Sequence, residues 1–168
     1  MHNHLYFVCP TDNLESIINK RFKNENYFYT SLGNSFNVNN SNRAFEDIKQ
    51  IVQKYDIDKI YFALSNDNKI LLDALEGHCF SSTERLKTYY NEVLSQSETS
   101  NIFCKSDNNK TSVISYYLNK KIEELQFKLI KCLEYSSIEI KGKIYNRHLG
   151  TFEDIYPKLI CIEQCVLN

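Results

Sequence analysis

The sequence has 168 residues but no tryptophan, one methionine, two prolines and four glycines. So few glycines and prolines argue against a β-sandwich with many tight turns, and they favour helices joined by short connections. The six cysteines include no Cys-x-x-Cys pair. Because the sequence also lacks a signal-peptide pattern, we expect reduced thiols rather than a disulfide framework.

An excess of charge of either sign is also missing, since 20 Lys and Arg stand against 21 Asp and Glu. Without a basic stripe, neither nucleic acid nor an anionic membrane surface is expected as a partner. No apolar stretch approaches the length of a membrane span. We therefore expect a cytoplasmic protein, with residues 1–168 forming a single domain around one core.

The most informative stretch is residues 58–73. Its apolar run at 59–64 is followed by the polar residues Ser65-Asn66-Asp67-Asn68, and apolar residues then return at helical spacing. This pattern predicts a buried strand, a tight turn and a helix. In open α/β sheets, ligands bind outside the carboxyl ends of the strands, so the turn is a candidate site.

Two similar units precede it. Residues 5–8 form an apolar run that ends in Cys9-Pro10-Thr11-Asp12, and residues 27–29 form a second run that ends in the turn at 30–34. Strands that alternate with helices in this way predict a parallel sheet with right-handed crossovers.

The remaining elements follow from apolar spacing. Asp12 and Glu15 have the spacing of a capping box, which predicts a helix start there. Apolar residues at helical spacing predict helices at 14–22, 44–55, 67–76, 82–94 and 111–133. Alternation predicts a strand at 137–145, a turn at 146–150 and a short strand at 151–155. The fold class is therefore α/β, a mostly parallel β-sheet flanked by helices with an antiparallel C-terminal hairpin.

This order of motifs resembles the β-class carbonic anhydrases. In that family the first strand delivers Cys-x-Asp-x-Arg, a second ends in an Asn-Ala-Gly-Asn-like turn, and a third ends in Gly-His-Ser-x-Cys-Gly. The corresponding segments here are FVCPTDN at 7–13, SLGN at 31–34 and FALSNDNK at 62–69. The C-terminal strand and hairpin at 138–150 also fit, so the resemblance spans almost the whole chain.

The resemblance implies a zinc ion held by two thiolates and one imidazole, whose bound water attacks carbon dioxide. Position by position, the zinc cysteines and histidine fall on Cys9, Asn68 and Ser65, and the Asp-Arg dyad falls on Thr11 and Asn13. Neither a serine hydroxyl nor an asparagine amide replaces an imidazole or a thiolate for zinc. We therefore predict a degenerate zinc site and no cofactor, with zinc bound only if the site is rearranged.

The turns at the strand ends are nevertheless expected to converge on a small polar pocket. Its candidate residues are Cys9, Thr11, Asp12, Asn13, Gly33, Asn34, Ser65 and Asn68. Such a pocket could take a small anion or a polar metabolite without a metal. The alternative is that these groups only satisfy one another and bound water.

Three functions are left open by this pattern. The first is a pseudoenzyme that keeps the scaffold for binding or assembly. The second is an active carbonate dehydratase with a rearranged metal site, for example Cys9 with His78 or Cys79, although neighbouring helix residues diverge by about 100°. The third is a thiolate enzyme or redox sensor acting through Cys9, which precedes a helix start but has no aligned histidine as its base.

Other potential metal ligands are interpreted as structural or adventitious. Cys161 and Cys165 lack further ligands nearby, and His2 and His4 alternate at the N-terminus. The resemblance implies a homodimer or pairing with a homologue, and the apolar segment 159–167 could pack on a partner subunit.

Overall fold

The computed structural model describes residues 2–35, 42–75, 90–91, 94, 109–132 and 138–155. Most of the helix expected at 82–94 and the apolar segment 159–167 lie outside these ranges. The same is true of His78, Cys79, Cys161 and Cys165. Within the described part of the chain, no helix is long and apolar enough to span a membrane.

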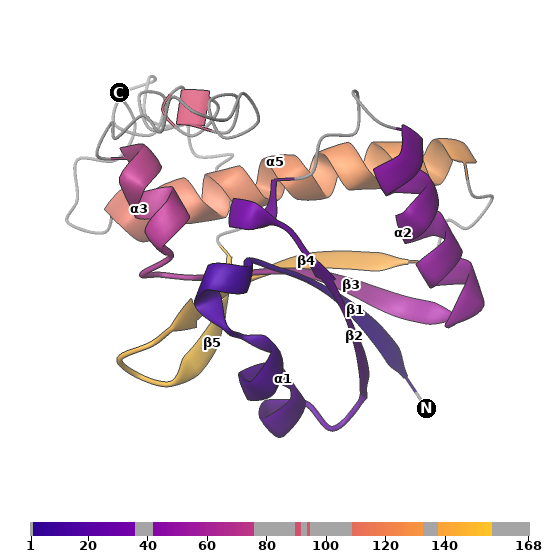
Figure 1. The fold of residues 1–168 in the computed structure, drawn as a ribbon, viewed down its shortest axis with the longest axis horizontal. Helices are drawn as coiled ribbons and strands as arrows, with labels where there is room; N and C mark the ends of the chain where they lie inside the picture. The colour runs from indigo at the N-terminus through magenta and orange to yellow at the C-terminus, as the bar shows by residue number, and fades with distance from the viewer. Residues whose placement is uncertain are drawn as a thin grey trace, which may run out of the picture.

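A five-stranded sheet with the order β2-β1-β3-β4-β5 forms the centre of the fold (Figure 1). The strands are β1 (Asn3–Val8), β2 (Glu25–Thr30), β3 (Ile57–Ser65), β4 (Glu139–Asn146) and β5 (Thr151–Asp154). The first four are parallel, and β5 is antiparallel to β4. The predicted α/β class with an antiparallel C-terminal hairpin is confirmed.

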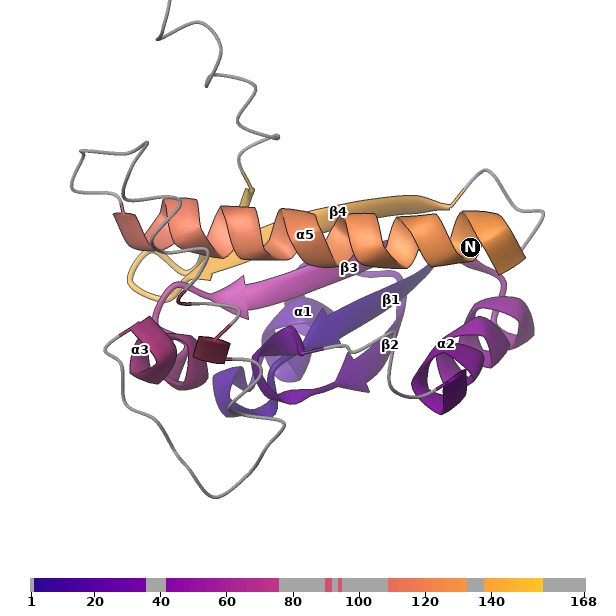
Figure 2. The same ribbon diagram turned by 90° about the horizontal axis from the view of Figure 1, so that it is seen from above.

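Helices cover the sheet unequally. They are α1 (Glu15–Arg21), α2 (Asn42–Lys54), α3 (Lys69–Leu75) and α5 (Asn109–Cys132), with short 3-10 turns η1 (Pro10–Asp12) and η2 (Leu32–Asn34). The longest, α5, lies across the face that α2 and α3 also cover, whereas α1 packs on the opposite face (Figures 1 and 2).

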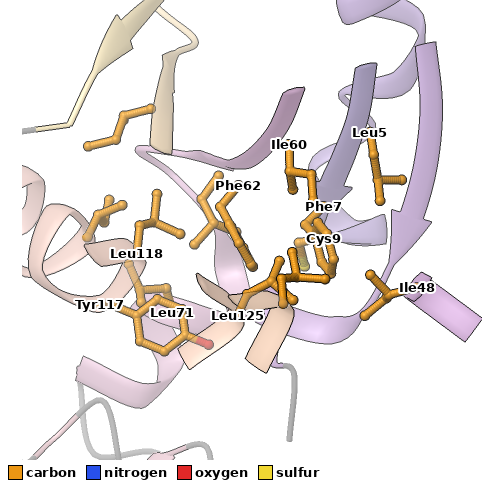
Figure 3. Close-up of a cluster of buried hydrophobic side chains, with 14 of the residues drawn as sticks. Leu5, Phe7, Cys9, Ile48, Ile60, Phe62, Leu71, Tyr117, Leu118 and Leu125 are labelled. Atoms are coloured by element: carbon orange, nitrogen blue, oxygen red, sulfur yellow. The ribbon is translucent and has the colours of Figure 1, made fainter. Parts of the chain in front are cut away.

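Strand alternation explains why the chain makes two hydrophobic layers. Leu5, Phe7 and Cys9 project to the face covered by α2, α3 and α5, whereas Tyr6 and Val8 project to the α1 face. Figure 3 shows Cys9 among apolar side chains from the sheet and the helices. The end of β1 is therefore anchored by buried side chains on both faces.

The strand order places a switch point between β1 and β3. The chain continues from β1 to β2 on one side and from β3 to β4 on the other. At such a point the connections leave in opposite directions, and the carboxyl ends of the two strands are left open between them. The turns after β1 and β3 thus meet where ligand sites of open α/β sheets occur.

The predicted capping box at Asp12 and Glu15 is wrong. Helix α1 begins at Glu15 with Leu14 as its N-cap, and no side chain caps it. Asp12 instead belongs to η1, and its carboxylate is bound by groups far along the chain. The Asp12 carboxylate therefore makes tertiary hydrogen bonds instead of the local cap that the sequence pattern predicts.

Candidate functional site

Three turns meet at the carboxyl ends of β1, β2 and β3. The Gly33 amide donates a hydrogen bond to Cys9 Sγ at 3.1 Å, which joins η2 to the end of β1. The Asn68 amide nitrogen donates to Asp12 Oδ1 at 2.8 Å, which joins the β3–α3 turn to η1. The structure thereby brings together seven of the eight candidate residues, namely Cys9, Thr11, Asp12, Gly33, Asn34, Ser65 and Asn68. Asn13 is exposed beside them and ends η1 in the left-handed conformation, at φ 52°.

Cys9 is fully buried at the end of β1. Its sulfur lies 3.0 Å from Thr11 Oγ1 in addition to the bond from Gly33. Gly33 has φ 60°, in the left-handed region that glycine adopts without strain. The thiol is therefore enclosed by its own turn and by η2.

Asp12 is the most unusual residue of the site, because its carboxylate is 1% exposed. Oδ2 accepts the Ser65 backbone N–H at 2.8 Å, and Oδ1 accepts the Asn68 amide at 2.8 Å. Burial raises the pKa of Asp12 to about 6, and the two hydrogen bonds together with the charge of Arg147 offset only part of that rise. At neutral pH the site holds a buried carboxylate.

Asn68 connects most of these groups. Its Oδ1 accepts the Leu71 N–H at 2.8 Å and so caps the N-terminus of α3. Its Nδ2 donates to Asp12 Oδ1 and also lies 3.3 Å from Thr11 Oγ1. Both ends of the amide are therefore occupied, and a hydrogen-bonded chain runs from Asn68 through Thr11 to Cys9.

Ser65, where the resemblance puts the zinc histidine, faces away from Cys9. As the last residue of β3 it continues the alternation of Tyr61 and Ala63, on the α1 face of the sheet. Its hydroxyl donates to the Asp67 carboxylate and lies 3.4 Å from the Tyr145 carbonyl oxygen. Only its backbone N–H enters the Asp12 site.

Arg147 also belongs to this site, although no sequence pattern points to it. This residue of the β4–β5 hairpin donates from Nε to both Asp67 oxygens, at 3.0 and 2.9 Å, and from Nη2 to the Asp12 carbonyl at 3.0 Å. Burial alone would raise the pKa of Asp67, but the hydrogen bonds from Ser65 and Arg147 outweigh it and hold that pKa below its ordinary value. Arg147 and Asp12 are 135 positions apart, and no local pattern signals their contact.

Asn34 leaves one polar atom without a partner. Its side chain is fully buried, and Nδ2 donates to the Ala63 carbonyl at 3.0 Å. Oδ1 has no hydrogen-bond partner. A buried acceptor without a donor costs about 1–3 kcal/mol, so this position favours a bound water or a ligand that carries an N–H or O–H group.

These donors do not fit a zinc ion. Of the three aligned positions, only Cys9 carries a ligand that zinc prefers, Asn68 offers a neutral amide that is already bonded on both ends, and Ser65 faces the other side of the sheet. Among the residues described by the structure, no three His, Cys, Asp or Glu side chains are grouped closely enough to hold a metal.

Comparison with known proteins identifies the fold. No protein-family model and no curated protein sequence matches the chain. Among solved structures, the β-carbonic anhydrase CafD of Aspergillus fumigatus is 14% identical, with 93% of this chain and 90% of that one covered and a TM-score of 0.71. A tetrameric β-carbonic anhydrase of Sordaria macrospora is 11% identical over 93% and 81% of the chains, with a TM-score of 0.72. The Coccomyxa enzyme in complex with acetazolamide is 10% identical over 92% and 72%, also with a TM-score of 0.72. Similarity at this level shows a shared fold.

Proposed function

We propose that this chain, whose fold is that of the β-carbonic anhydrases, is a pseudoenzyme that binds a small polar molecule or assembles with other chains. The observation that carries the proposal is the state of Asn68, which lies where the resemblance puts the second zinc cysteine. Its amide caps α3 and holds the buried Asp12 carboxylate. These hydrogen bonds support a structural role for position 68 rather than a metal-binding one.

Binding zinc at Cys9 would oppose this arrangement. Thr11 would have to leave the sulfur, and any ligand at position 68 would have to leave Asp12. A buried carboxylate that loses a hydrogen bond is strongly destabilised, because charged groups depend on their partners more than neutral ones do. Zinc would therefore have to offset the loss of the present network with fewer than three suitable ligands.

The charge of the site bears on the ligand class. Two carboxylates, Asp12 and Asp67, face one guanidinium, Arg147, which is already paired with Asp67. This balance disfavours a small anion, one of the two ligand classes expected from the sequence. It supports the other, a polar metabolite, and the unpartnered Asn34 Oδ1 supports one with N–H or O–H donors.

Assembly is the second part of the proposal. The Sordaria macrospora proteins of the same fold are tetrameric. We infer that this chain also forms a homo-oligomer, with a homodimer or pairing with a homologue as the smallest unit. Light scattering coupled to size-exclusion chromatography tests this part, and a monomer at micromolar concentration would contradict it.

The burial of Cys9 argues against a thiolate enzyme or an oxidant sensor. Its sulfur has no exposed surface and is enclosed by Gly33 and Thr11. Reactive cysteines lie in partly exposed environments, whereas buried ones are inert. A structural role for this thiol fits the geometry better.

Metal analysis of the untagged protein by plasma mass spectrometry, with a carbon dioxide hydration assay, tests the proposal. We expect no stoichiometric zinc and no activity above the buffer. The Cys9→Ser variant is the matched control, because it removes the only retained ligand position. About one zinc per chain that is lost in Cys9→Ser, together with hydration activity, would refute the proposal and support the rearranged site.

A further inference from the structure

The ends of β1 and β3 are joined by a pair of side chains with complementary polar atoms. Asp12 follows β1, and Asn68 follows β3. Each is at most 1% exposed, and the contact between Asp12 Oδ1 and Asn68 Nδ2 is 2.8 Å long. Two buried polar groups from the turns that follow adjacent parallel strands thus satisfy one another at the switch point of the sheet.

The other polar atom of each side chain accepts a hydrogen bond from the backbone. Asp12 Oδ2 accepts the Ser65 N–H, and Asn68 Oδ1 accepts the Leu71 N–H. The pair therefore fixes both the last residue of β3 and the first turn of α3. Loss of either side chain would leave buried N–H groups without acceptors.

We propose that Asp12 and Asn68 form a structural joint that fixes the turns after β1 and β3 without a metal ion. This proposal rests on the proposed function in one respect only, namely that these turns bind no zinc. The joint explains why Asp12 is buried despite its charge, and why the position of the second zinc cysteine is an asparagine. An amide supplies both a donor to the carboxylate and an acceptor to the helix, whereas a thiolate has no hydrogen to donate to the carboxylate.

Arg147 closes the joint from the hairpin side. Its Nη2 holds the Asp12 carbonyl, and its Nε holds Asp67 in the turn that contains Asn68. The β4–β5 hairpin is thereby tied to both turns. Four hydrogen bonds from Arg147 and its backbone reach this region, counting the one from its N–H to Asn66 Oδ1.

A reciprocal exchange of the two side chains tests the joint. In the Asp12→Asn variant, an N–H group faces the Asn68 donor or the Ser65 donor, so one bond is lost. In the Asn68→Asp variant, the helix cap is kept but two carboxylates meet. In the double variant, the new amide at position 12 donates to the new carboxylate at 68, and the acceptors for Ser65 and Leu71 are both kept. Size and net charge are unchanged in the double variant.

The test is urea unfolding at pH 7. The Asn68→Asp replacement lowers the folding equilibrium constant by about tenfold or more, because two buried carboxylates then meet. The Asp12→Asn replacement loses one hydrogen bond but also removes the cost of a buried charge, so it serves to complete the comparison rather than to decide it. The double variant recovers to within about threefold of the wild type, because the pairing is restored. Asp154→Asn, at an exposed aspartate paired with Lys143, is the matched control and changes the constant by less than about threefold.

The double variant keeps the test decisive even if a single variant fails to fold. A double variant as unstable as the product of both single effects would overturn the joint, as would an Asn68→Asp variant that matches the wild type. Stoichiometric zinc with hydration activity would refute the proposed function, whereas a double variant that does not recover would refute the joint, so the two failures can be told apart.

Discussion

The buried carboxylate of Asp12 predicts an unusual dependence of stability on pH. Its pKa rises from 3.8 to about 6 on folding, because burial disfavours the charged form more than the hydrogen bonds from Ser65 and Asn68 favour it. A carboxyl whose pKa is raised by folding stabilises the native state while it is protonated in both states. This contribution is fully present below about pH 4 and is lost as the pH rises through about 6.

The magnitude follows from the size of the shift. A shift of about two pKa units corresponds to about 3 kcal/mol, at 1.36 kcal/mol per unit. Carboxylates with lowered pKa values act in the opposite direction at lower pH. The pKa of Glu139 is lowered to about 2 by Lys141 and Lys59, and that of Asp67 is also lowered, so both lose favourable pairing as the medium becomes acidic. The wild-type profile is the sum of these effects.

A comparison with Asp12→Asn isolates the residue of interest. Urea unfolding of both proteins is measured from pH 4 to pH 8, and the difference between their free energies of unfolding is plotted against pH. We expect the free energy of unfolding of the wild type, relative to Asp12→Asn, to fall by about 2 kcal/mol between pH 4 and pH 7, which is less than the full effect because the unfolded carboxyl is already partly ionised at pH 4. A difference that stays constant or grows over this range would show that hydrogen bonding outweighs burial at Asp12, which would refute the argument.

Two other substitutions test contacts around the hairpin. Arg147→Ala removes the ion pair with Asp67 and the bond to the Asp12 carbonyl, and we expect the free energy of unfolding to fall by about 1 kcal/mol, because the pair is partly exposed; a loss no larger than that of Lys143→Ala would contradict this. Gly142→Ala places a Cβ 2.5 Å from Ile155 Cδ1 and 3.0 Å from its Cγ1 and Cγ2, so we expect a loss of about 1–3 kcal/mol in thermal or urea unfolding. Adding Ile155→Ala should remove most of the additional loss, and purely additive effects would rule out the clash.

The sheet could be predicted from the sequence because its strands carry local signals. The apolar runs at 5–8 and 59–64 lie within β1 and β3, and the run at 27–29 lies within β2. The expected strand at 137–145 is β4, and the alternation with helices predicted parallel pairing. The strand boundaries differ from the expected ones by at most two residues, since the polar ends of a strand still pair with their neighbours.

The internal connections of the site could not be predicted in this way. Convergence of the turns follows from topology, but which side chain bonds to which depends on contacts between distant positions. The spacing from Glu15 predicts that Asp12 caps a helix, yet its carboxylate accepts the backbone N–H of Ser65, 53 positions away. Alignment with the zinc histidine predicts Ser65 in the pocket, but Ser65 pairs with Tyr145 in β4, and strand alternation turns its side chain to the other face of the sheet. The role of Arg147 could not be predicted, because sequence patterns in a turn indicate the local backbone conformation and not the distant groups that its side chain contacts.

The long separation between β3 and β4 has a consequence for folding. Strands β1, β2 and β3 all lie within residues 3–65, so their pairing needs only short crossovers, whereas Ser65 pairs with Tyr145 across 80 positions. Contacts that close long loops form late, because their entropy must be lost before they stabilise anything. We therefore expect a three-stranded nucleus that already contains Asp12 and Asn68. The C-terminal hairpin docks onto this nucleus afterwards and delivers Arg147 to turns that have already taken shape.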